Sequence, residues 1–352
     1  MARKTTRTAK KVEPATLLWF EVENFKSIKK LRIELRPLMV LVGPNGAGKT
    51  NIMQALALAL DLLRGDHASV VERYGGYEQL VRLGVRRASH IRLSIGIGVL
   101  PRPKGRSPGR VEIAFRMTPD RTVPDPSLVS MAAALQLPTA IRLRLDASAL
   151  RSDVAGGMLQ GGLLGISGDG LPRAVERVRG TPAFKRILAG LQTVYPRIET
   201  VDTVQLLPGE VALRFKERSI KDGLGQANVS DGVMHALALL LVLEASDPGS
   251  TLLIEEPENA LHPWALRTIL RRVQESPRPG PLLLATHSPT LIDAVEDPAS
   301  LFIVENDDRK GTVVTPALTR EKALRSILAE SGQKLGEVWL GGLLGGVPDG
   351  DA

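Results

Sequence analysis

The sequence predicts an α/β fold in which helices flank a mixed sheet and a further lobe is inserted into the chain. Short apolar runs alternate with segments of helical spacing in the last third of the chain, the pattern of a parallel sheet covered by helices. A continuous apolar run at 38–42 is typical of a buried parallel strand. Proline, glycine and basic residues crowd 101–109 and mark a boundary. We therefore predict a basic disordered arm at 1–14, a main domain formed by 15–100 and 195–352, and an inserted lobe at 101–194.

The elements can be placed along the chain from their apolar spacing. Strands are predicted at 17–22, 31–35, 38–42 and 91–99, with a helix at 49–63. In the lobe, 111–117 and 141–145 have strand character and 172–191 has helical spacing. Pro208 and Gly209 lie between two strand-like runs and predict a hairpin. Beyond it we expect, in order, a helix at 233–245, a strand at 251–254, a helix at 264–274, a strand at 282–285, a helix at 289–295 and a strand at 301–304.

Composition narrows the class of protein. The chain of 352 residues is 43% hydrophobic and 24% charged, the balance of an ordinary globular protein. No apolar run approaches the roughly 20 residues that span a bilayer, and the basic, polar start has no signal-peptide pattern, so we expect a cytoplasmic protein without a membrane partner. The absence of cysteine excludes disulfides and cysteine nucleophiles. A net charge of +8 favours an anionic partner such as nucleic acid.

A glycine-rich loop carries the clearest chemistry. Residues 43–50 read GPNGAGKT, the pattern GxxxxGK[ST] between an apolar strand and a helix, and we call them the P-loop. Such a loop wraps backbone N–H groups around phosphates, while Lys49 neutralises phosphate charge and the Thr50 hydroxyl binds Mg²⁺. The predicted cofactors are therefore ATP and Mg²⁺. The residues assigned to the nucleotide here are Asn45, Gly46, Gly48, Lys49, Thr50 and Asn51.

An acidic pair ends another predicted strand. Residues 252–256 read LLIEE, which places two carboxylates at the carboxyl end of an apolar strand, where open α/β sheets bind ligands. Glu255 would hold the Mg²⁺ shell, and Glu256 would orient and deprotonate the attacking water. The alternative is an acidic pair that caps a helix on the surface, since Pro257 follows.

Two further motifs accompany these. NVSDG at 228–232 precedes an apolar helix, and Ser230 lies 255 − 230 = 25 residues before Glu255, which leaves room for one helix, a turn and a strand. Taken alone, Ser230 is an ordinary helix N-cap. LLATHS at 283–288 is a strand that ends at His287, whereas His67, His90 and His235 have a structural interpretation.

Together these segments resemble a known family. LWFEVENFKS at 18–27, the P-loop, VSDG at 229–232, IEEPENALHP at 254–263 and THS at 286–288 resemble the ATPase heads of the SMC, RecF and OLD-type group, and specifically the short AAA-family proteins called AAA_21. The resemblance implies a P-loop NTPase of ABC-ATPase head type that hydrolyses ATP, with Lys49, Glu256 and His287 as catalytic residues. It implies an ATP-dependent homodimer in which Ser230 and Gly232 meet the nucleotide of the other copy, and 259–263 crosses the interface as the D-loop. Lys26 and Ser27 would also lie at the nucleotide.

The sequence departs from the family at several positions. Glu255 stands where most P-loop proteins carry aspartate, and the motif at Ser230 lacks the second glycine and the glutamine of transporters. In the family, a glutamine joins the metal site to the neighbouring lobe. Gln79 is the best candidate for this glutamine, and it is equally consistent with a surface residue.

The sequence alone leaves the choice of binding partner open. No acidic residue lies between Glu78 and Glu112, whereas eight basic residues do, and this stretch fits either a groove for duplex DNA or a solvated loop. ATP-driven closure would act on DNA or on a separate effector protein, in DNA repair or phage defence. The alternative is an ATP sensor with slow hydrolysis that controls a separate effector. A transporter subunit fits less well, because the FKS segment at 25–27 and Glu255 resemble the DNA-linked group.

Overall fold

The structure is a computed structural model, and it describes residues 16–82, 90–99, 109–124, 137–153, 163–275, 280–317 and 334–341. The predicted arm at 1–14 lies outside these residues. None of the helices in the described ranges has both the length and the apolar character needed to cross a bilayer.

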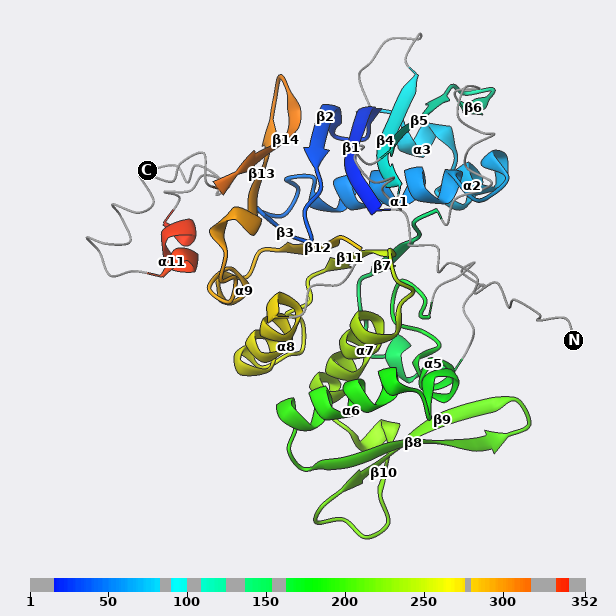
Figure 1. Cartoon of the computed structure of the whole chain (residues 1–352), viewed down its shortest axis with the longest axis vertical. Coiled ribbons are helices and arrows are strands. Elements are labelled where there is room, and N and C mark those ends of the chain that lie inside the picture. Colours follow the sequence, from blue (N-terminus) through cyan, green and yellow to red (C-terminus); the bar gives the residue numbers. More distant parts are fainter. Residues whose placement is uncertain are drawn as a thin grey trace, which may run out of the picture.

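One large sheet organises the chain (Figure 1). Its eleven strands run in the order β6-β5-β4-β1-β2-β14-β13-β3-β12-β11-β7. The strands β13, β3, β12, β11 and β7 pair in parallel: β13 (Leu301–Asp307), β3 (Leu38–Val42), β12 (Leu282–Thr286), β11 (Thr251–Glu255) and β7 (Ala140–Leu143). The remaining strands pair antiparallel: β1 (Thr16–Phe25), β2 (Ile28–Glu34), β4 (Ile91–Val99), β5 (Gly109–Met117), β6 (Thr122–Pro124) and β14 (Gly311–Pro316). The predicted mixed α/β fold is confirmed.

Helices cover both faces of the parallel strands (Figure 1). On one side lie α1 (Lys49–Leu62), α2 (His67–Arg73) and α3 (Tyr77–Leu80). On the other lie α7 (Asp231–Ala245) and α8 (Pro263–Glu275), with α5 (Leu171–Val178) and α6 (Pro182–Val194) beyond them toward the smaller sheet, and with α9 (Pro289–Ile292) and α11 (Leu335–Leu340) near one end. Alternate residues of β3 enter different cores: Val40 packs with α7 and α8, and Leu41 packs with α1. Because both faces are buried, this strand is apolar throughout.

The second, smaller sheet carries a long hairpin. β8 (Ile198–Leu207) and β9 (Glu210–Glu217) pair antiparallel around Pro208 and Gly209, as predicted, and β10 (Leu224–Gly225) completes the three strands. The stretch 172–191 differs from the expectation of one helix, because Gly180 adopts a left-handed φ of 78° and separates α5 from α6. Thr181 then caps α6 by accepting the Phe184 N–H at 3.2 Å.

The segment predicted as an inserted lobe contributes to both parts of the fold. Its strands β5, β6 and β7 belong to the large sheet, whereas α5 and α6 pack against α7 and the smaller sheet. The boundaries at 101 and 194 stay a prediction.

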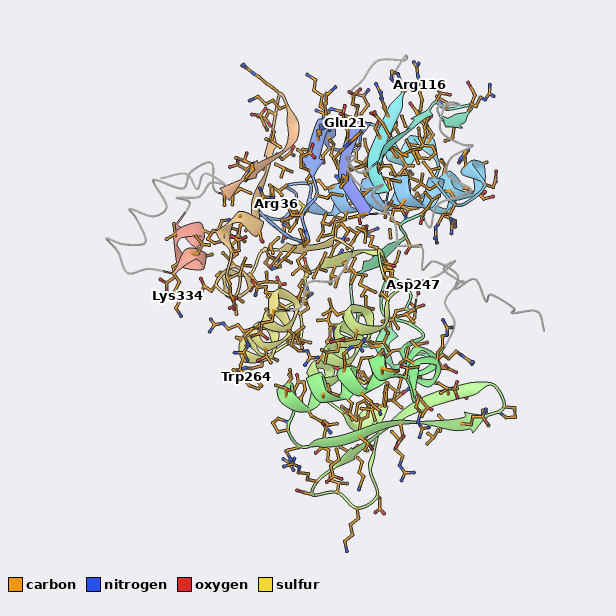
Figure 2. All side chains as sticks on the ribbon, viewed as in Figure 1. Glu21, Arg36, Arg116, Asp247, Trp264 and Lys334 are labelled. Carbon is orange, nitrogen blue, oxygen red and sulfur yellow. The ribbon has the colours of Figure 1, made fainter. Side chains whose placement is uncertain are left out.

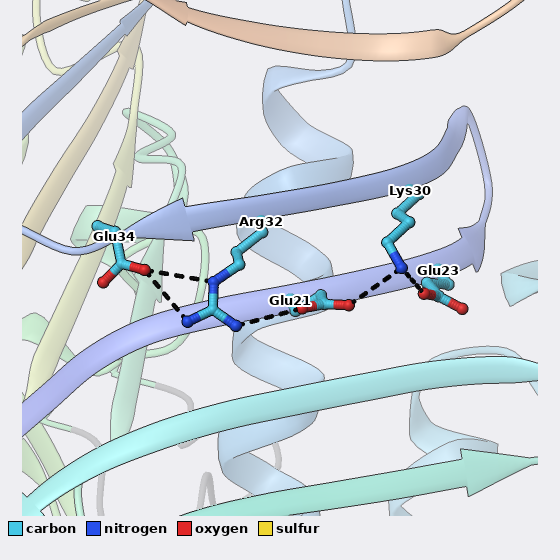
Figure 3. A network of polar contacts seen from close by, with 5 residues as sticks. All are labelled: Glu21, Glu23, Lys30, Arg32 and Glu34. Atoms are coloured by element: carbon cyan, nitrogen blue, oxygen red, sulfur yellow. Dashed lines mark hydrogen bonds and ion pairs between the residues drawn. The ribbon is translucent and has the colours of Figure 1, made fainter.

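The exposed face of the β1–β2 hairpin is covered by ion pairs (Figure 3). Lys30 Nζ lies 2.5 Å from Glu23 and 3.4 Å from Glu21, and Arg32 lies 3.4 Å from Glu21 and 3.2 Å from Glu34. Three carboxylates thus face two cations. This part of the sheet surface therefore offers no surplus positive charge to an anionic partner.

Candidate nucleotide-binding site

The P-loop connects β3 to α1 with a backbone that requires glycine. Gly46 and Gly48 have φ values of 82° and 104°, in the left-handed region that other residues rarely adopt. Gly48 is the N-cap residue of α1, and no described side chain caps this helix. The first N–H groups of a helix lack partners within it and carry partial positive charge, so this end of α1 suits an anion.

Lys49 lies over the P-loop. Its ammonium donates to the carbonyl of Gly43 at 2.5 Å and to that of Pro44 at 2.9 Å. Burial lowers the pKa of Lys49 below its ordinary value, although Glu256 and two neighbouring carboxylates act in the opposite direction. The side chain is therefore held by the loop at the position where phosphate charge is expected.

Thr50 and Glu255 meet next to it. Thr50 Oγ1 donates to Glu255 Oε2 at 2.5 Å. The other carboxylate oxygen, Oε1, accepts from Nε and Nη2 of Arg142 at 2.9 and 2.8 Å. Glu255 is only 4% exposed, so Arg142 compensates a buried charge. This burial rules out an exposed capping carboxylate at Glu255.

The donors at this point fit Mg²⁺. The ion prefers oxygen ligands and is commonly held by one or two protein groups, with substrate phosphates and water completing its shell. Thr50 Oγ1 and Glu255 Oε2 are two such oxygens, and they already lie together. Arg142 engages the opposite oxygen and leaves this pair facing the P-loop side.

Glu256 has a backbone that sets it apart from Glu255. Its φ is 48°, and its N–H donates to the carbonyl of Ala285 at 2.8 Å. Its carboxylate accepts from Asn259 Nδ2 at 3.0 Å and lies 3.8 Å from His287 Nδ1. A left-handed glutamate is costly and persists only where its surroundings fix it. Glu256 and His287, whose side chains are 25% and 46% exposed, therefore form a partly exposed pair beside buried Glu255.

Glu258 joins the ends of β11 and β12. Its carboxylate accepts from the Thr286 hydroxyl at 2.5 Å, and the same hydroxyl accepts the Ser288 N–H at 2.9 Å. Burial raises the pKa of Glu258 above its ordinary value, against the effect of the Thr286 hydrogen bond. Glu258 was not among the residues predicted from the sequence.

The turn between β1 and β2 reaches the P-loop helix. Lys26, with φ of 44°, donates to Gln54 Oε1 at 2.7 Å. Asn51 Nδ2 donates to Ser27 Oγ at 2.7 Å, and Ser27 is 2.6 Å from Thr312 Oγ1. Lys26 and Ser27 thus contact Gln54 and Asn51 of α1, next to the P-loop.

The segment 226–232, which we call the signature segment, starts α7. Ser230 is the N-cap residue by position, and its side chain forms no cap hydrogen bond. Ser230 is exposed, whereas Gly232 is buried. A Cβ at Gly232 would lie 2.7 Å from the Tyr195 hydroxyl and 2.8 Å from the Ala260 carbonyl, so this glycine allows 259–263 to pack closely. The hydroxyl of Ser230 remains available for an outside partner.

Other predicted residues are not brought to this centre. Gln79 is exposed on α3, and no hydrogen bond in the described structure joins it to Thr50 or Glu255. Arg82 donates to the carbonyl of Ser27 at 2.6 Å. Most of the basic stretch lies outside the described residues: Arg86, Arg87, Arg102, Lys104 and Arg106.

Two family models match the chain. Residues 169–293 match AAA_21, described as "AAA domain, putative AbiEii toxin, Type IV TA system", and residues 18–73 match AAA_15, an AAA ATPase domain. Among solved structures, an SMC head bound to the C-winged helix domain of ScpA aligns over 87% of this chain and 99% of its own, with a TM-score of 0.60 and 15% identity. Two segments of the chain thus match models of AAA ATPase domains, and the fold is like that of an SMC head.

Curated relatives match the chain over short segments. A DNA double-strand break repair Rad50 ATPase of Methanopyrus kandleri is 39% identical over 69 residues, 19% of this chain and 7% of the relative. An OLD nuclease of Thermus scotoductus is 48% identical over 40 residues, 11% of this chain and 8% of the relative. The chain thus matches under a tenth of the length of each. The predicted resemblance to the SMC, RecF and OLD-type group is confirmed.

The structure places two arginines at the candidate site that were not predicted from the sequence. Arg142 binds Glu255, and Arg151 pairs with Asp231 at 2.8 Å in the signature segment. An available signal was the presence of Arg142 inside a short apolar strand, where a charged side chain needs a buried partner.

Proposed function

We propose that the chain binds Mg-ATP and hydrolyses it, and that two copies bind the nucleotides between them. One observation carries the proposal: Thr50, Glu255 and the Glu256–His287 pair, which come from distant parts of the sequence, meet at the carboxyl edge of neighbouring parallel strands beside Lys49. This edge is where open α/β sheets bind ligands.

Each residue then has a role that its position supports. The N–H groups of the P-loop and Lys49 hold the phosphates, and Thr50 and Glu255 hold Mg²⁺. The bound ion would offset charge on the phosphate oxygens. The Glu256 side chain is 25% exposed, so a water molecule can reach it and pass a proton to it, and His287 at 3.8 Å orients it.

The surface near the signature segment supports binding of a second copy. Ser230 is exposed at the start of α7, a helix of 15 residues whose N-terminus carries positive potential. Trp264 is 52% exposed at the start of α8, directly after the D-loop (Figure 2). Large exposed aromatics are typical of interfaces. An isologous dimer, the commonest symmetry, would cover both features.

Turnover of the Glu256→Gln variant tests the hydrolysis. We expect it to bind ATP with the affinity of the wild type and to lose at least about a hundredfold in turnover, as expected on removal of a general base. Glu275→Gln is the matched control, because Glu275 is exposed on α8, away from the P-loop. Equal turnover in the two variants would contradict the role of Glu256.

A second candidate is an ATP sensor with slow hydrolysis that controls a separate effector protein. The observation that favours it is the pairing of Glu255 with Arg142, which places a fixed cation beside the metal site. Wild-type turnover well below about 1 per second, the lower end of typical enzymes, together with tight ATP binding would favour this sensor.

The partner we propose is duplex DNA, in a cytoplasmic setting. The name of the Rad50 relative refers to DNA repair, and that of the OLD relative to a nuclease. The charge of +8 is in keeping with a phosphate backbone. Since the cations on β1 and β2 are paired with carboxylates, the basic stretch after Glu78 is the better candidate for DNA contacts, and most of it lies outside the described residues. Binding that is insensitive to salt would contradict this proposal.

A further inference from the structure

A short segment of the chain connects the candidate metal site to the signature segment. Residues 142–151 begin at Arg142 in β7, which binds Glu255, and end at Arg151, which binds the start of α7. Each end thus places a guanidinium on one of the two regions that the proposed function requires to act together.

At the first end, the pairing of strands fixes Arg142. β7 runs parallel to β11 with Arg142 opposite Leu253, two residues before Glu255. The Arg142 side chain is 18% exposed and forms two hydrogen bonds with one carboxylate oxygen. A buried pair of this kind has a defined geometry, and a third charge nearby disturbs it strongly.

Between the ends, the backbone is held firmly. Asp146 Oδ1 accepts the N–H groups of Ser148 and Ala149, both at 3.0 Å, and these bonds fix the turn. Leu150, which follows in the short 3₁₀ helix Ala149–Arg151, is fully buried. Such a segment moves as a unit rather than absorbing a displacement locally.

At the second end, Arg151 holds the signature segment. Its guanidinium donates to the carbonyl of Val229 at 2.8 Å and to that of Gln226 at 3.2 Å, and it pairs with Asp231. The amide of Gln226 returns a hydrogen bond to the carbonyl of Arg151 at 2.6 Å. The contacts of Arg151 therefore fix the position of Ser230.

We infer that Arg142 is a positioning residue that couples the Glu255 carboxylate to the signature segment. The inference rests on the proposed function, because Mg-ATP must bind. A dication beside Glu255 repels the guanidinium and competes for the carboxylate. Arg142 then shifts, and 142–151 carries the shift to Arg151 and Ser230. Arg142 thus takes the linking role for which the sequence suggested Gln79.

A single fluorescent label can follow the signature segment. The chain has no cysteine, so Asn228→Cys in the full-length protein gives one labelling site, and Asn228 is exposed. The fluorescence of an environment-sensitive dye at this position is recorded first with ATP in the presence of EDTA. It is then recorded as Mg²⁺ is added in steps. Measurements at several protein concentrations separate a response within one chain from dimerisation.

Three substitutions in the labelled protein distinguish binding from coupling. Arg142→Gln should abolish the dye response to Mg²⁺, and calorimetry should show a Mg²⁺ concentration at half-saturation about tenfold lower, because the competing cation is gone. Arg151→Gln should still bind Mg²⁺ and should abolish the response. Arg144→Gln is the matched control, an exposed arginine two residues further along, and should change neither.

The outcomes separate this inference from the proposed function. If the wild type fails to bind ATP, the proposed function itself is wrong. If the wild type binds Mg-ATP and both Arg142→Gln and Arg151→Gln keep the full dye response, the coupling is overturned. Should Arg142→Gln fail to fold, Arg142→Lys retains the charge without the two-bond contact and should show a reduced response, whereas an unchanged one counts against the coupling.

Discussion

Thr50 Oγ1 lies 2.5 Å from Glu255 Oε2, although 205 residues separate them in the sequence. This contact joins the helix after β3 to the end of β11 across the intervening strand β12. The proposed Mg²⁺ site lies at this contact, because a hydroxyl and a carboxylate together offer two hard oxygen ligands.

Gly48 is predicted to be essential for both stability and nucleotide binding. Its φ of 104° disfavours any side chain, and a Cβ there would also contact Thr312 Oγ1 and Ser27 Oγ. Gly48→Ala should therefore destabilise the protein by about 2–3 kcal/mol in chemical denaturation and should abolish ATP binding. Gly170→Ala, at φ of 83° with open space around it, should cost only about 1–2 kcal/mol and keep ATP binding. Equal effects of the two changes would show that contacts at the P-loop are unimportant.

Glu258 is predicted to make stability fall as pH rises. Burial raises the pKa of Glu258 above its ordinary value of 4.5, so the unfolded chain loses this proton first. Between the two pKa values the unfolded state binds fewer protons, and the free energy of unfolding therefore decreases with increasing pH. Glu258→Gln should raise the melting temperature at pH 7 and change it little at about pH 4. A melting temperature that rises equally at both pH values would speak against titration of Glu258.

Ser230 is predicted to act between two copies. Because it is exposed and makes no cap bond, Ser230→Arg should leave ATP binding by the monomer unchanged and prevent ATP-dependent association. Ser219→Arg adds the same side chain at another exposed position and should not affect association. Sedimentation with and without Mg-ATP measures both. Loss of ATP binding in the monomeric Ser230→Arg protein would place Ser230 at the nucleotide of its own chain.

The sequence predicted the site residues that belong to a continuous motif and missed those whose partners lie far away along the chain. The P-loop and the LLIEE run each combine a strand with its terminal residues, so local spacing was enough to place Lys49 and Glu255. Arg142 could not be placed, because its partner lies 113 residues away and depends on the parallel pairing of β7 with β11. The break at Gly180 was missed because apolar spacing continues across it. Gln79 was chosen by residue type, without information on position.

The measurement that tests the central claim most directly is the mass in solution of Glu256→Gln protein, by light scattering, with and without Mg-ATP. This variant should retain bound ATP because its general base is removed. The account predicts a mass of 37.9 kDa without nucleotide and twice that value with Mg-ATP. A mass that stays at 37.9 kDa with the nucleotide demonstrably bound would contradict the proposal that two copies bind ATP between them.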